Sequence, residues 1–199
     1  MNPILEAMRK RFCADDPAAT VGVVNIKASA IKASDPKNPD DIVCVATTDY
    51  TDLDSEVVVP GGADMSYFLA NNAIFVDHNY DVESVVAKRR SIVAWPDVTA
   101  LKGWRVRCSL VKGSRFEPTI RALAQDGVLG CSIGLQAMDW GPLSIEEKAM
   151  YPKAKSIVRR WKWLELSFTS MPCNQECRVT LSGSDNVTNT KAKRTIVVV

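Results

Sequence analysis

The stretch SIVRRWKWLELSFTSMP, residues 156–172, predicts the most hydrophobic strand of the chain, ended by Pro172. Side chains along a strand alternate between its two faces. Glu165 therefore lies among aromatic residues, where an ionised carboxylate costs free energy unless it is paired or hydrogen-bonded. One face of the strand carries Trp161, Trp163, Glu165 and Ser167. The opposite face carries Leu164, Leu166 and Phe168.

Two kinds of partner for the Glu165 carboxylate remain open. The N–H of an imidazole ring would suit it, and the chain contains one histidine. A salt bridge to Arg159 or Arg160 of the same strand, or to Arg105 or Arg107, would serve as well. The strand by itself does not decide between these partners.

Shorter β-rich runs, separated by turn-forming residues, precede this strand. They lie at residues 21–29, 42–48, 55–62, 73–78, 83–95, 103–111 and 128–137. Roughly seven strands thus interleave with a few short helices, without the regular alternation that a doubly wound parallel sheet requires. The pattern predicts a mainly β domain with peripheral helices, of α+β class, folded as a closed or nearly closed barrel of roughly seven strands.

Three segments have helical signals. Residues 63–71 have apolar side chains at helical spacing, and two later helices have the sequence of a capping box, in which a serine precedes a glutamate by three positions. The first of these helices is predicted at residues 114–127, with Ser114 and Glu117 at its start and Gly127 at its end. The second is predicted at residues 143–151, with Ser144 and Glu147 at its start.

Length and composition limit the class of protein. The chain has 199 residues, of which 46% are hydrophobic and 24% charged, as expected for one globular domain. We expect an N-terminal arm or short helix at residues 1–20, the folded domain at 21–180 and a tail at 181–199. The formal net charge of +2 is too near balance to indicate a nucleic-acid or anionic-membrane partner. No segment reaches the roughly 18 apolar residues of a membrane span.

The six cysteines are expected to be free thiols, mostly buried, in a reducing compartment. The chain has no CxxC motif and a single histidine, which disfavours a zinc site. An acidic turn, DYTDLD at residues 49–54, lacks the glycine and the terminal glutamate of a calcium loop. No phosphate-binding or dinucleotide-binding loop is present. We therefore expect neither a metal nor a cofactor.

The predicted strand 130–137 contains a candidate nucleophile. Alternation directs Cys131 toward the core and Ser132 away from it, and Gly130 and Gly134 share the face of the serine. The two glycines would leave room there for a substrate backbone. His78 is the only histidine, so any imidazole general base must be this residue. Ser132 on the solvated face of an edge strand and a structural histidine at a strand end are the simpler alternatives.

Three motifs, VDHNYD (76–81), CSIGL (131–135) and LELSFTSMPCN (164–174), occur in this order behind an acidic turn and a Val-Val-Pro-Gly stretch. Together they resemble the prohead maturation protease family of tailed bacteriophages, which is related in fold to the herpesvirus assembly proteases. The resemblance covers roughly residues 44–178. It implies a barrel of the herpesvirus assembly protease type, with Ser132 as nucleophile, His78 as general base and Glu165 orienting the imidazole. The chemistry agrees, because a serine needs an adjacent base and that base needs a third group to hold its tautomer.

The same resemblance implies a biological setting. The substrates would be the phage scaffold protein and major capsid protein, cut inside the immature capsid in the host cytoplasm, and the enzyme would also cut itself. The resemblance also implies self-association into dimers or larger homo-oligomers, whereas nucleic acid and membrane are not expected as partners. Arg159 and Arg160 are candidates for oxyanion support, since the related herpesvirus enzymes use an arginine.

Two other functions compete with this one. The barrel could serve as a non-catalytic capsid-assembly or scaffolding module, in which Ser132, His78 and Glu165 do not align. A cysteine hydrolase acting through Cys131 is disfavoured, because that side chain points inward unless the strand register slips by one residue.

Overall fold

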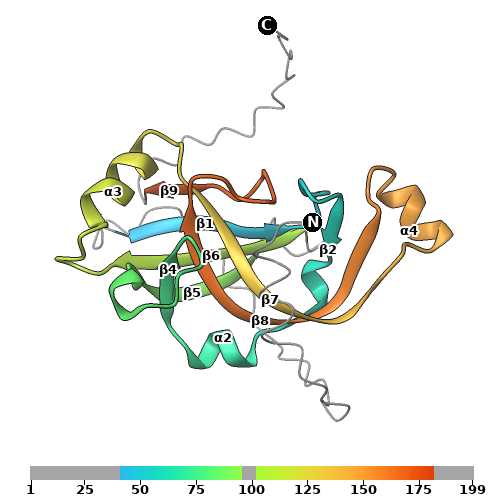
Figure 1. The fold of residues 1–199 in the computed structure, drawn as a ribbon, viewed down its shortest axis with the longest axis horizontal. Coiled ribbons are helices and arrows are strands. Elements are labelled where there is room, and N and C mark those ends of the chain that lie inside the picture. The colour runs from blue at the N-terminus through green and yellow to red at the C-terminus, as the bar shows by residue number, and fades with distance from the viewer. Residues whose placement is uncertain (1–40, 96–101, 182–199) are drawn as a thin grey trace, which may run out of the picture.

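The computed structural model describes residues 41–95 and 102–181 (Figure 1). The predicted arm at 1–20, the predicted strand 21–29 and the tail after residue 181 lie outside this part of the chain. The strands are β1 (Asp41–Thr48), β2 (Glu56–Val58), β3 (Ala63–Asp64), β4 (Ala73–Val76), β5 (Ala87–Trp95), β6 (Gly103–Leu110), β7 (Gly130–Gly141), β8 (Ser156–Thr169) and β9 (Val179–Leu181). The helices are α2 (Ser66–Ala70), α3 (Glu117–Gln125) and α4 (Ile145–Met150), with short 3-10 helices η1 (Pro60–Gly62) and η2 (Val82–Ser84).

Strand β8, the hydrophobic stretch on which the sequence prediction centred, organises the sheet. β2, β3 and β4 pair in parallel with successive parts of it, and β7 pairs antiparallel along almost its whole length. The sheet continues from β4 through β5, β6 and β1 to β9 by antiparallel pairing. The described strands thus form one mixed, nine-stranded open sheet. The mainly β, α+β class is confirmed, but closure of the predicted barrel is not shown.

β8 is buried on both faces toward its end, from Glu165 to Phe168, whereas Arg160 in its first half is exposed. On one face Trp161 and Trp163 are fully buried, and the ring of Trp163 stacks on Phe68 of α2 with centroids 4.5 Å apart. Leu166 and Phe168 are buried on the other face. Both indole N–H groups donate to backbone carbonyls, as buried indoles require. The predicted alternation of this strand is therefore correct, and the side chains from Glu165 to Phe168 lie in a packed interior.

The sheet curves, so that β7 approaches β1 across the core. The thiol of Cys131 donates to the carbonyl of Val45 at 3.0 Å, and the thiol of Cys177 donates to Ala46 at 3.3 Å. The five described cysteines are free, four of them buried and Cys173 half-buried. This result confirms the predicted thiols for all but Cys13, which lies outside the described residues.

The predicted helix caps had mixed outcomes. Ser144 and Glu147 form the expected capping box at the start of α4. The box predicted for Ser114 and Glu117 is wrong, because residues 114–117 form a turn in which the carbonyl of Ser114 accepts from the N–H of Glu117, and α3 begins only at Glu117. Gly127 ends this helix with a φ of 68°, as expected. No helix in residues 41–95 or 102–181 is long and apolar enough to cross a membrane.

Candidate active site

A half-buried histidine is paired with a buried glutamate where β4 meets β8. Nδ1 of His78 is 2.7 Å from Oε1 of Glu165, and the two side chains are 17% and 4% exposed. β4 brings His78 here because it runs parallel to β8, with Phe75 opposite Ser167. Of the two partners that the sequence left open for Glu165, the structure shows the imidazole rather than an arginine.

The backbone that carries His78 has an unusual conformation. Asp77 and His78 have φ values of 49° and 55°, in the left-handed region that residues other than glycine rarely adopt. Such a residue costs roughly 1–3 kcal/mol, so the surroundings must hold it. The N–H of Asp77 donates to the carbonyl of Phe168 at 2.9 Å, and the N–H of His78 donates to the hydroxyl of Ser167 at 3.2 Å. Both acceptors belong to β8, which therefore holds the turn.

Ser132 lies on the same face as this pair, as the register of β7 on β8 shows. Gly134 is opposite Glu165, and Ser132 is opposite Ser167. A Cβ atom on Gly134 would lie only 2.2 Å from Oε1 of Glu165, so this face of β7 points at the carboxylate. Ser132 precedes Gly134 by two residues and so shares its face.

The glycines beside Ser132 have a different role from the one expected. The sequence predicted that Gly130 and Gly134 leave room for a substrate. In the structure the space beside Gly134 holds the Glu165 side chain, and a Cβ on Gly130 would lie 2.6 Å from the ring of Pro172. Both glycines therefore admit neighbouring side chains of the protein itself, which correct packing requires.

Ser132 and His78 both lie next to Ser167, but no hydrogen bond joins them in the described residues. Directly opposite residues of an antiparallel pair have Cβ atoms about 4.5–5.5 Å apart, which places the Ser132 side chain beside that of Ser167. Ser167 in turn touches the backbone of His78. The hydrogen bond between Ser132 and His78 stays a prediction, of a kind that often tightens only when substrate binds.

The surroundings favour the charged form of the imidazole. Burial lowers the pKa of His78, but the hydrogen bond to Glu165 and the negative charges of Glu165 and Asp77 outweigh it, so the pKa lies above its usual value of 6.5. The Glu165 carboxylate faces Nδ1 of His78. In the tautomer that carries its proton on Nδ1, Nε2 can accept a proton from another group. The pair has the form of a general base with an orienting carboxylate.

Ser167 is a member of the site that the sequence did not single out. Its hydroxyl donates to Oε2 of Glu165 at 2.7 Å, while it accepts from the N–H of His78, and the residue is fully buried. The signal was present in the alternation of residues 156–172, which puts Ser167 on the face of Glu165. Nothing in that pattern indicated a contact with His78.

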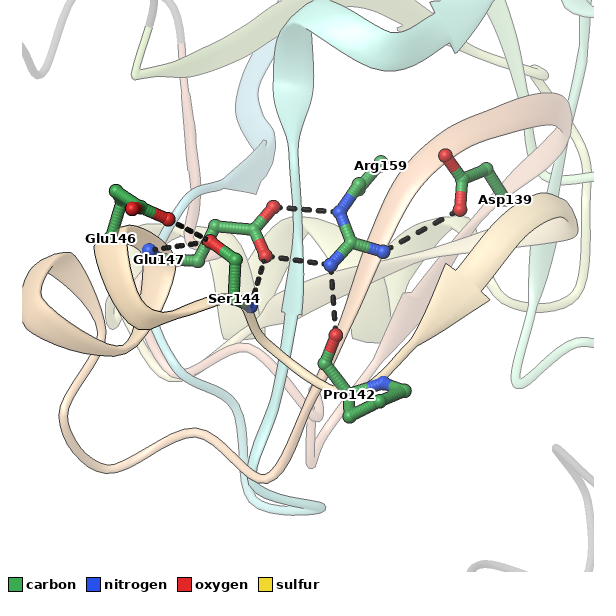
Figure 2. Close-up of polar contacts among 6 residues, drawn as sticks. All are labelled: Asp139, Pro142, Ser144, Glu146, Glu147 and Arg159. Atoms are coloured by element: carbon green, nitrogen blue, oxygen red, sulfur yellow. Dashed lines mark hydrogen bonds and ion pairs between the residues drawn. The ribbon is translucent and has the colours of Figure 1, made fainter.

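The arginines proposed for oxyanion support lie elsewhere. Figure 2 shows Arg159 bound to both carboxylate oxygens of Glu147 at 2.6 Å, to the carbonyl of Pro142 at 2.8 Å and, more distantly, to Asp139 at 3.5 Å. It precedes Glu165 by six residues, which is roughly 20 Å along a strand. Arg160 is exposed on the same part of β8. The structure therefore brings neither arginine to Ser132.

Cys131, the acidic turn and the end of the LELSFTSMPCN motif have structural roles. Cys131 is fully buried, and this burial raises the pKa of its thiol well above the usual value, so it is not a poised nucleophile. In the acidic turn, the Asp52 carboxylate accepts from the N–H groups of Asp54 and Glu56 and so shapes the turn. Asn174 donates to the carbonyl and the hydroxyl of Thr48, tying the loop after β8 to β1.

Comparison of this chain with known proteins finds no matching family model, curated protein or solved structure. The site geometry and the motifs in the sequence are therefore what indicate a function.

Proposed function

We propose that this chain is a serine endopeptidase with Ser132 as nucleophile, His78 as general base and Glu165 as the residue that orients the base. The observation that carries the proposal is the 2.7 Å contact between His78 Nδ1 and Glu165 Oε1, on the face of β8 that Ser132 shares. An exposed histidine would need neither a buried carboxylate nor a constrained turn. The position of a serine on the adjacent strand supplies the third member.

The mechanism follows from these positions. His78 takes the Ser132 proton on Nε2 as the serine oxygen attacks the carbonyl carbon of a peptide bond, and Glu165 stabilises the imidazolium. The imidazolium returns the proton to the leaving amine. Water then attacks the acyl carbon while His78 takes its proton, and the imidazolium passes that proton to the Ser132 oxygen as the carboxylic acid leaves. The raised pKa of His78 favours the charged intermediate. With Arg159 and Arg160 placed elsewhere, backbone N–H groups are the remaining candidates for the oxyanion hole.

The motif resemblance supports a role in capsid maturation. On this proposal, the described sheet is part of a barrel of the herpesvirus assembly protease type, and the substrates are the scaffold protein, the major capsid protein and the enzyme itself. Cleavage takes place inside the immature phage capsid in the host cytoplasm. Confinement with the substrate at high effective concentration permits low intrinsic affinity.

The test is to co-express the chain with its scaffold and capsid partners and to measure the intact mass of every chain, with Ser132→Ala as the matched control. The proposal expects shortened partners with the parent chain and full-length partners with Ser132→Ala. Equal masses in both, with capsid shells still formed, would refute it and favour the non-catalytic assembly module.

A further inference from the structure

One buried hydroxyl links the two residues of the candidate base. Ser167 has no exposed surface, and its hydroxyl contacts the carboxylate of Glu165 at 2.7 Å and the backbone N–H of His78 at 3.2 Å. A hydroxyl has one proton to donate and lone pairs to accept with. Here the proton goes to Glu165 and a lone pair receives the His78 N–H, so the orientation of the hydroxyl is determined from both sides.

The His78 turn depends on this contact. Asp77 and His78 are consecutive residues in the left-handed region, so the turn relaxes if its hydrogen bonds are lost. The N–H of Asp77 is held by the carbonyl of Phe168, which any residue at position 168 would supply. The N–H of His78, in contrast, donates to the side-chain hydroxyl of Ser167. This second hydrogen bond therefore depends on which residue is at position 167.

The same hydroxyl restrains the carboxylate. Oε1 of Glu165 faces His78 Nδ1, while Oε2 receives the Ser167 proton. With both oxygens bonded, the carboxylate cannot rotate about its terminal torsion without breaking a bond. The absence of a side chain at Gly134 makes the room that this carboxylate occupies.

We propose that Ser167 is a positioning residue, whose hydroxyl holds the His78 turn and the Glu165 carboxylate in the one arrangement that points the imidazole at Ser132. The catalytic consequence rests on the proposed serine peptidase function. The positional effect on His78 does not, and can be measured separately.

The first measurement is an NMR titration of His78, which as the only histidine of the chain gives an unambiguous imidazole signal. The charged groups that act on it are Glu165 of β8 and Asp77 of its own turn. We expect the midpoint of the parent chain above 6.5. In Ser167→Ala the turn relaxes away from Glu165, so we expect the midpoint to fall toward 6.5, and Ser167→Thr, which keeps the hydroxyl, to restore it.

The second measurement is the rate at which a fluorophosphonate labels Ser132, read from the intact mass between pH 5 and 9. In this reaction the serine oxygen forms a bond to phosphorus, fluoride leaves and His78 takes the proton. A base misplaced by about 1 Å slows such a step roughly 100-fold, so we expect Ser167→Ala to be roughly 10- to 100-fold slower. Ser156→Ala is the matched control, because Ser156 is also on β8 and donates to a carboxylate, that of Glu56, at 3.0 Å.

The outcomes separate the two ideas. A parent chain that is not labelled and does not cut its partners refutes the peptidase, while the titration still tests Ser167. A folded Ser167→Ala chain whose titration midpoint and labelling rate match those of Ser156→Ala overturns the positioning role, as would a midpoint that rises. If Ser167→Ala does not fold, Ser167→Cys, which keeps the volume and weakens the donor, takes its place. Failure of every Ser167 variant to fold would make Ser167 a core residue and also overturn the proposal.

Discussion

The substitution Gly134→Ala directly tests how tightly the candidate site is built. The added Cβ would lie 2.2 Å from Oε1 of Glu165, 2.8 Å from its Cγ and 2.9 Å from its Cδ. An ordinary contact begins at 3.4 Å, so the carboxylate oxygen would have to move by about 1.2 Å. The opposing backbone belongs to the central strand β8, so the side chain of Glu165 must give way.

Two effects follow from this displacement. Overpacking a filled interior typically costs about 1–3 kcal/mol, while replacing a strand glycine by alanine recovers roughly 0.5–1 kcal/mol of conformational entropy. We expect the free energy of unfolding to fall by about 1–2 kcal/mol. A shift of 1.2 Å also breaks the 2.7 Å contact between Glu165 and His78, and we expect fluorophosphonate labelling of Ser132 to slow by roughly 100-fold.

Urea unfolding gives the first quantity and intact mass after labelling gives the second. The control is Gly141→Ala, at the end of the same strand, where a Cβ would meet nothing within 4 Å. We expect this control to change stability by no more than about 0.5 kcal/mol. A Gly134→Ala chain as stable as the control, with the His78 titration of the parent, would show that Glu165 is not confined as described.

Three further outcomes are expected. Because the pKa of His78 is raised above 6.5, its contribution to stability is fully present below about pH 6.5 and is lost as the pH rises through the folded pKa. The rate of Ser132 labelling should increase over that same rise in pH. In urea melts and labelling profiles, Glu165→Gln should move both transitions to lower pH. Arg159→Ala should leave the labelling rate at the parent value, and a large loss would contradict the placement of this side chain at α4. Iodoacetamide should spare Cys131 in the native chain, where its thiol is buried, and a single rapid adduct on it by peptide mass mapping would restore the cysteine hydrolase hypothesis.

Several features of the fold followed from local pattern. The alternation in residues 156–172 correctly placed Glu165 with the tryptophans, and the alternation in 130–137 correctly buried Cys131. The capping box of α4 was also predicted, because it involves residues three positions apart. The one at Ser114 failed, since the same residues also favour a turn and the chain uses the backbone carbonyl of Ser114 for that turn.

The sequence by itself determined which side chains share a face of each strand, because alternation is a local property of extended backbone. It also contained the three motifs from which Ser132, His78 and Glu165 were named. Only the tertiary structure decided what each face meets. The contact between His78 and Glu165 joins residues 87 positions apart, and the left-handed turn at His78 is held from β8. Likewise, Arg159 binds Glu147 and not the candidate site, and the side chain of Glu165 fills the space beside Gly134. These contacts join residues that are distant in the sequence, so no local pattern could predict them.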